Sequence, residues 1–216
     1  MGGRVNRRRL AFVLTVLVVT SGCLGALTGG ESTYEAAPAD VTDAAAAETG
    51  FEKNGTRDSV ATREVDATSG TVRVVSKVTT YDKSLEIPLL GSARLGVFRL
   101  VSTPAVEVAG QSYNPVGDYS NDRLARFAAE QSGSLSAAGL ERVSSRRVLV
   151  LGTETTVTKY ATTTTIGGQE VDVFVHVTKV RDGDDYVVAI GVYPRAVDQE
   201  SEVLTLLRSV EHPADT

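Results

Sequence analysis

Four β-patterned segments that follow one another with very short turns constrain the fold more than any other feature. Gly152 allows a tight connection between the first two, and Gly167-Gly168 and Asp182-Gly183 are typical two-residue hairpin signals. The sequence therefore predicts an antiparallel four-strand meander near the C-terminus. Its strands are Glu141–Val150, Thr153–Ile166, Gln169–Val180 and Asp185–Tyr193.

Alternation within these segments predicts how they are buried. Valines at positions 171, 173, 175 and 177 share one face of the third strand, and Asp172, Phe174, His176 and Thr178 share the other. The segment from Tyr186 to Tyr193 is apolar on both faces, which favours a central position in the sheet.

Three helices are expected around this sheet. The first is Asp40–Thr49, with Asp40 as its N-cap and Gly50 as its end. The second runs from a Ser120 cap to Gln131, with Gly133 beyond it and an apolar stripe of Leu124, Phe127 and Ala128. The third is Gln199–Val210, whose stripe is Val203, Leu206, Leu207 and Val210, and His212-Pro213 stops it.

Earlier strands complete the domain. They are Thr71–Tyr81, which is dense in β-branched residues, and the shorter Gly96–Ser102 and Val106–Ala109, which Thr103-Pro104 separates. An antiparallel sheet with helices packed on it is an α+β fold. We expect one such domain over residues 40–213.

The N-terminus reads as an export signal. Four arginines and no acid precede the eleven residues Leu10–Thr20, which are apolar except for two threonines, and Ser21-Gly22 then forms a small-residue cleavage site. A bilayer span needs about 20 apolar residues, so this core is short for a permanent span. Residues 1–22 are therefore expected to be removed. Arg7-Arg8-Arg9-Leu10 also looks like a twin-arginine signal, although arginine-rich leaders are common in exported chains.

Cys23 is the expected lipidation site. Thr20-Ser21-Gly22-Cys23 resembles a lipobox, with Thr20 where leucine is usual, and Cys23 is the only cysteine. A two-chain lipid on Cys23 would anchor the chain durably to the outer face of the cell membrane. Residues 23–39 would then form a lipidated, flexible tether. The alternative is an ordinary signal with an incidental cysteine.

Charge excludes some partners. Removal of the four leader arginines takes the net charge from −5 to −9. Nucleic acid and anionic headgroups both require positive patches, so we expect neither as a partner. The acid-rich, lysine-poor composition resembles that of halophilic proteins, whose self-repulsion high salt screens, and a merely acidic domain is the alternative.

The densest polar loop is Asn114–Asp122. Asp118, Asn121 and Asp122 could offer oxygen ligands to calcium, but the spacing matches no EF-hand loop, and a turn leading to the Ser120 cap explains the same residues. Asn54-Gly55-Thr56 is an N-glycosylation sequon, a motif that is often unoccupied.

No residue is expected to be catalytic and no cofactor is expected. His176 and His212 would have to converge with other ligands to form a metal site or an acid–base pair, and no spacing motif suggests this. Nucleophile-elbow and phosphate-cradling motifs are missing from the sequence.

Three blocks carry a family resemblance: Ser102-Thr103-Pro104, Asn114–Asp118, and His176-Val177-Thr178 with Gly183-Asp184-Asp185. With these blocks the chain resembles haloarchaeal lipoproteins of domain-of-unknown-function family 6517 over roughly residues 40–213. The resemblance implies a haloarchaeal membrane lipoprotein and brings no known activity. More distantly, the order of elements looks like the PsbP and LpqN type of fold, whose members mostly act as accessory or binding proteins.

The leading functional hypothesis is a membrane-anchored, non-catalytic binding or accessory module. The second is a small-ligand or cation receptor that uses the Asn114–Asp122 loop, and the third is a hydrolase. The sequence names neither the ligand nor the protein partner.

Overall fold

A computed structural model describes residues 30–65, 70–87, 91–108, 110–166 and 168–214. The expected signal peptide, Cys23 and the first part of the expected tether lie outside these residues, as do Ala109 and Gly167.

The C-terminal meander is confirmed. Strands β8 (Glu141–Val150) and β9 (Thr153–Ile166) have the predicted bounds, while β10 (Gln169–Asp182) and β11 (Asp185–Pro194) extend slightly further than predicted. All three neighbouring pairs are antiparallel. The β8–β9 turn places Leu151 and Gly152 at positive φ, 49° and 70°, which suits the twist of a hairpin.

The other half of the sheet is larger than predicted. β4 (Gly70–Ile87) and β5 (Gly91–Pro104) contain the expected Thr71–Tyr81 and Gly96–Ser102. β5 includes Thr103-Pro104 and ends there, so the expected break between the two strands lies at residues 105–106. β3 (Glu52–Val65), which was not predicted, pairs with β4. Residues 52–64 are all exposed, so no alternation of polar and apolar residues marked this strand.

The segment Glu31–Glu35 was expected within the tether, and this is wrong. It forms β1, which pairs in parallel with Thr71–Val75 of β4. β1 is defined by its backbone pairing with β4, and such pairing leaves little signal in the sequence of a five-residue segment. The sheet is therefore a mixed eight-stranded sheet of order β1-β4-β5-β11-β10-β9-β8, with β3 also paired to β4.

Helix bounds differ from the predictions at four ends: the start of the first helix, the end of the second and both ends of the third. α1 is Asp43–Thr49, and its N-cap is Thr42 rather than Asp40, because Asp40–Val41 forms β2, which pairs with β12 (Val210–Glu211). The same pairing shortens the third helix to α3, Glu200–Arg208. α2 is Asn121–Ser132, and its predicted Ser120 cap and Gly133 end are confirmed.

Short elements link β5 to α2. β6 (Glu107–Val108) lies within the expected strand Val106–Ala109, of which Val106 is not part of the strand and Ala109 is outside the described residues, and it pairs with β7 (Gln111–Ser112). The 3-10 helix η1 (Pro115–Asp118) follows, with Asn114 as its cap.

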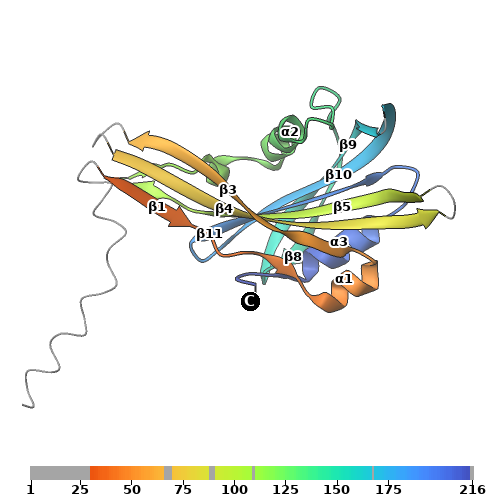
Figure 1. Cartoon of the computed structure of the whole chain (residues 1–216), viewed down its shortest axis with the longest axis horizontal. Helices are drawn as coiled ribbons and strands as arrows, with labels where there is room; N and C mark the ends of the chain where they lie inside the picture. The colour runs from red at the N-terminus through yellow and green to blue at the C-terminus, as the bar shows by residue number, and fades with distance from the viewer. Residues whose placement is uncertain (1–29, 66–69, 88–90, 109, 167, 215–216) are drawn as a thin grey trace, which may run out of the picture.

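The helices lie on both faces of the sheet, which makes the fold α+β (Figure 1). α1 and α3 pack on one face over a core that includes Phe98, Leu100 and Leu206. α2 packs on the other face against β9 and β10, over Tyr160, Val175 and Val177. Within α2 the predicted stripe is partly wrong, because Phe127 is 46% exposed and Ala125 and Ala129 are buried instead.

Candidate functional site

An open groove lies on the α2 face of the sheet. Its cavity volume is about 990 Å³. Strands β3, β4, β5, β9, β10 and β11 line it together with α2 and the turn that follows α2. The groove exists because α2 has only 12 residues and packs on β9 and β10, so the rest of this face is left without a helix over it.

The floor of the groove is apolar. Alternate residues of neighbouring strands point toward it, and Leu135 and Ile166 add apolar surface at the α2 side. The strand residues are Val78, Val97, Val173, Ile190 and Val192. A ligand with an apolar body would remove this surface from water, which stabilises a complex.

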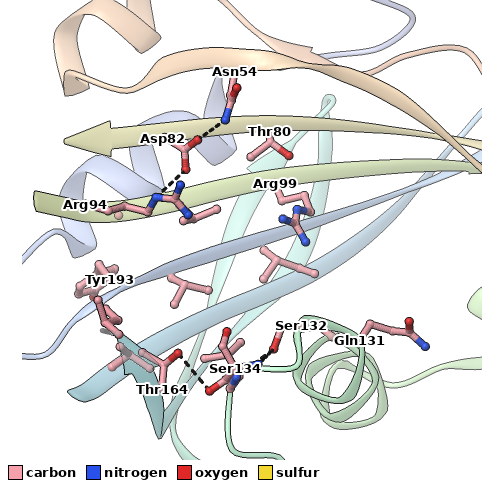
Figure 2. Close-up of a pocket in the computed structure, with 18 of the residues that line it drawn as sticks. Asn54, Thr80, Asp82, Arg94, Arg99, Gln131, Ser132, Ser134, Thr164 and Tyr193 are labelled. Carbon is pink, nitrogen blue, oxygen red and sulfur yellow. Dashed lines mark hydrogen bonds and ion pairs between the residues drawn. The ribbon is translucent and has the colours of Figure 1, made fainter. Parts of the chain in front are cut away.

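Three arginines line the β3–β5 side: Arg57 on β3 and Arg94 and Arg99 on β5. Asp82 is the only acid among the described lining residues, so the lining carries a net charge of +2, from three positive groups and one negative, within a chain of net charge −5. Figure 2 shows Arg94 and Arg99 on β5, across the groove from Ser132, Ser134 and Thr164.

Two β-bulges place these polar side chains on one face. The β4–β5 register shifts between Lys83 and Ser84, so that Leu95 is an extra residue and Arg94 and Arg99 share a face although they are five residues apart. The β3–β4 register shifts between Lys53 and Gly55, which makes Asn54 the extra residue. Without the bulge at Leu95, strict alternation would send Arg94 and Arg99 to opposite faces.

Asp82 is already engaged at this wall. Its Oδ2 accepts a hydrogen bond from Asn54 Nδ2 at 2.6 Å, and its Oδ1 lies 3.4 Å from Arg94 Nε, an ion pair without a hydrogen bond (Figure 2). Asn54, the sequon residue, is exposed at the groove rim. Its glycosylation stays a prediction.

Arg99 has no comparable partner. Its Nε is buried and has no hydrogen-bond partner among the described residues. Burial lowers the pKa of the guanidinium, the charges of Arg57 and Arg94 lower it further, and Asp82 raises it. An arginine stays protonated in a protein, so the groove holds a half-buried positive group whose Nε lacks an acceptor among the described residues.

The predicted cation loop already surrounds a cation of the chain itself. Lys179 Nζ donates to the carbonyl oxygens of Val116, Gly117 and Tyr119 at 2.8, 2.5 and 2.9 Å. The ammonium group therefore occupies the place where these carbonyls converge.

The three candidate side chains of that loop do not converge. Asp118 is exposed, and Asn121 Nδ2 donates to the Thr156 carbonyl at 2.8 Å. Asp122 Oδ1 accepts from Tyr160 OH at 2.7 Å, a bond that lowers the pKa of the carboxyl group. No cluster of three or more His, Cys, Asp or Glu side chains suited to a metal ion occurs within the described residues.

The two histidines lie in separate clusters away from the groove floor. His176 is 2% exposed, stacks on Tyr193 with ring centroids 5.6 Å apart, and its Nε2 lies 3.1 Å from Tyr193 OH. Burial lowers the pKa of His176 to about 4.

His212 joins a cluster that the sequence did not indicate. Its Nδ1 lies 2.9 Å from Asp182 Oδ2, and its Nε2 lies 3.1 Å from both Asp185 Oδ2 and Ser102 Oγ. Ser102 and Asp182 lie at opposite nitrogens of the His212 imidazole, an arrangement that resembles a catalytic triad. However, Ser102 is 0% exposed, and Asp185 lies at the same nitrogen, Nε2, as Ser102. A nucleophile must reach its substrate, so this cluster is suited to holding the C-terminal segment against the β10–β11 hairpin.

The sequence analysis did not identify the groove arginines, because Arg57 is far in sequence from Arg94 and Arg99 and no motif joins the three residues.

None of the helices in the described part of the chain has the length and hydropathy of a membrane span.

Comparison with known families gives one match. The family model described as "Domain of unknown function (DUF6517)" matches residues 38–211, so the chain belongs to that family. A search of curated proteins finds no match.

Proposed function

We propose that this member of the DUF6517 family is a non-catalytic binding module, tethered to the outer face of the cell membrane by a lipid on Cys23. The groove on the α2 face is the ligand site of this proposal. The rest of the domain serves as a rigid support that holds the site away from the membrane.

The groove is the observation that carries the proposal. Its volume of about 990 Å³ falls at the upper end of the range of about 300–1,000 Å³ typical of small-ligand sites. An apolar floor with a few polar groups at the edges is also typical of such sites. The groove walls come from strands of the main sheet, so the site is largely preformed.

The groove chemistry favours binding over catalysis. Among the described lining residues there is one carboxylate, Asp82, and no histidine or cysteine. Both oxygens of Asp82 are engaged within the chain, one by the Asn54 hydrogen bond and the other by the Arg94 ion pair.

The signal-like residues 1–22, followed directly by Cys23, support the proposal of a lipid anchor. The acidic composition supports the proposal of a high-salt, haloarchaeal source. Intact mass of the membrane-extracted chain tests the anchor. A mature mass that begins at Cys23 with a lipid increment, lost together with membrane attachment in Cys23→Ser, is expected. An unlipidated wild-type mass would contradict it.

Native mass spectrometry of the full chain after mild extraction tests the ligand site. We expect a co-purifying small molecule that is lost when Ala128→Trp fills the groove from α2, and retained in Ala47→Trp, an equivalent change on exposed α1 surface. Retention of the molecule in both variants would place binding elsewhere and refute the groove as the site.

A further inference from the structure

We infer that the groove recognises an amphiphilic anion, with an oxyanion head at Arg57, Arg94 and Arg99 and an apolar body over the valine and isoleucine floor. This inference rests on the proposed function and names the ligand class of the same site. A carboxylate and a phosphate monoester share this head chemistry.

The positive charge of the groove lining indicates that the ligand is negatively charged. The chain as a whole is acidic, with a net charge of −5, whereas the groove lining carries three arginines against the single Asp82. Like charges held together on one wall repel one another, and this repulsion contributes to lowering the pKa of Arg99. An anion that enters the groove would relieve the repulsion.

The hydrogen-bonding capacity of the wall indicates an oxyanion. Asp82 engages Arg94, whereas Arg57 and Arg99 have no carboxylate within ion-pair distance among the described residues. The buried Nε of Arg99 has no hydrogen-bond acceptor among the described residues, and an unpaired buried donor is costly inside a protein. A guanidinium group presents a planar fork of donors that matches the oxygens of a carboxylate or a phosphate.

The bulges show that the arginine placement is built into the sheet. The extra residue Leu95 turns Arg94 to the face that Arg99 occupies, and Arg57 reaches this face opposite Val78 of β4. The wall therefore belongs to paired strands and does not depend on a loop.

The apolar floor defines the other half of the ligand. Val97 lies between Arg94 and Arg99 on β5, and Ile190 and Val192 lie beside them on β11, the next strand toward β10. Leu135 and Ile166 add further apolar surface to the lining. A small inorganic ion would leave this surface in contact with water. An anion that carries an aliphatic or aromatic body would cover it.

Calorimetric titration of the full chain in phospholipid nanodiscs, with empty nanodiscs as the reference, tests the inference. The probes are hexanoate, hexyl phosphate and 1-hexanol, which share one apolar body and differ in the head. We expect at least one anion to bind more tightly than hexanol, and the preferred anion identifies the head. Added salt should weaken anion binding and leave hexanol binding unchanged.

Two charge variants are expected to change the affinity for the anion in opposite directions. Arg99→Gln should weaken anion binding by roughly tenfold to a hundredfold, the loss expected for charge-assisted hydrogen bonds. Asp82→Asn should tighten anion binding, because the only carboxylate among the described lining residues is replaced by a neutral amide. Arg208→Gln, on exposed surface of α3 across the sheet, is the matched control and should have no effect.

The outcomes separate this inference from the proposed function. Absence of binding by both anions at millimolar concentration overturns the anion inference. Hexanol binding that equals anion binding, with no effect of Arg99→Gln and loss in Ala128→Trp, overturns the anion inference and retains the groove. Anion binding that survives both Arg99→Gln and Ala128→Trp overturns both.

Discussion

Acid should weaken the fold through His176. In the native chain the pKa of this imidazole is lowered from 6.5 to about 4, chiefly by burial, with Lys159 and Arg146 lowering it and Glu200 opposing them. Between these two values the unfolded chain binds a proton that the native chain does not. The stabilisation is therefore complete above pH 6.5 and is lost as the pH falls toward 4.

The structure gives the magnitude. Each pKa unit corresponds to about 1.4 kcal/mol, so the separation from 6.5 to about 4 corresponds to about 3 kcal/mol of unfolding free energy. His176 is 2% exposed, so solvent screens the effect little. Denaturant unfolding at a series of pH values from 7 to 4, followed by circular dichroism, measures this loss.

Two variants test whether His176 causes the pH dependence of the unfolding free energy. His176→Gln cannot take up the proton, so its unfolding free energy should fall less than that of the wild type over the same pH range. Tyr193→Phe removes the hydroxyl that lies 3.1 Å from Nε2 but keeps the imidazole buried, and should retain the wild-type pH dependence. Equal pH dependence in wild type and His176→Gln would refute the reasoning.

Three further variants test particular contacts by denaturant unfolding. Lys179→Met removes the donor to three carbonyls of the 114–122 loop, and should cost about 2 kcal/mol and speed amide exchange in that loop; unchanged exchange would contradict this. Gly191→Ala would place Cβ 2.7 Å from Val203 Cγ1, and should cost about 1–2 kcal/mol, less in a Val203→Ala background; equal costs would exclude the clash. His212→Ala leaves two carboxylates and a buried serine without their shared partner, and should cost about 2–4 kcal/mol; a loss below about 1 kcal/mol would contradict this.

The meander could be predicted because its signals are local. Valine alternation and glycine turns specify β8 to β11 within about fifty consecutive residues, and the Ser120 cap and Gly133 end specify α2 in the same way. β1 and β3 could not be predicted, because Glu31–Glu35 and Glu52–Val65 owe their strand conformation to pairing with β4.

The candidate cation site at Asn114–Asp122 also depends on residues that are distant in sequence. Asn114–Asp122 is rich in oxygen atoms in the sequence, but Lys179 arrives from β10, about sixty residues later, and donates to its carbonyls. Likewise Ser102, Asp182 and His212 carry no common motif and meet only when β5, the β10–β11 hairpin and the C-terminal segment pack together.

The sequence by itself determined the α+β class, the four-strand meander and the acidic character of the chain, because these depend on neighbours in sequence and on composition. Only the tertiary structure decided where the groove lies and what lines it. A bulge at Leu95 turns Arg94 onto the face of Arg99, and β3 brings Arg57 beside them. Register shifts and long-range strand pairing depend on the total energy of the packed sheet, which no short stretch of residues encodes.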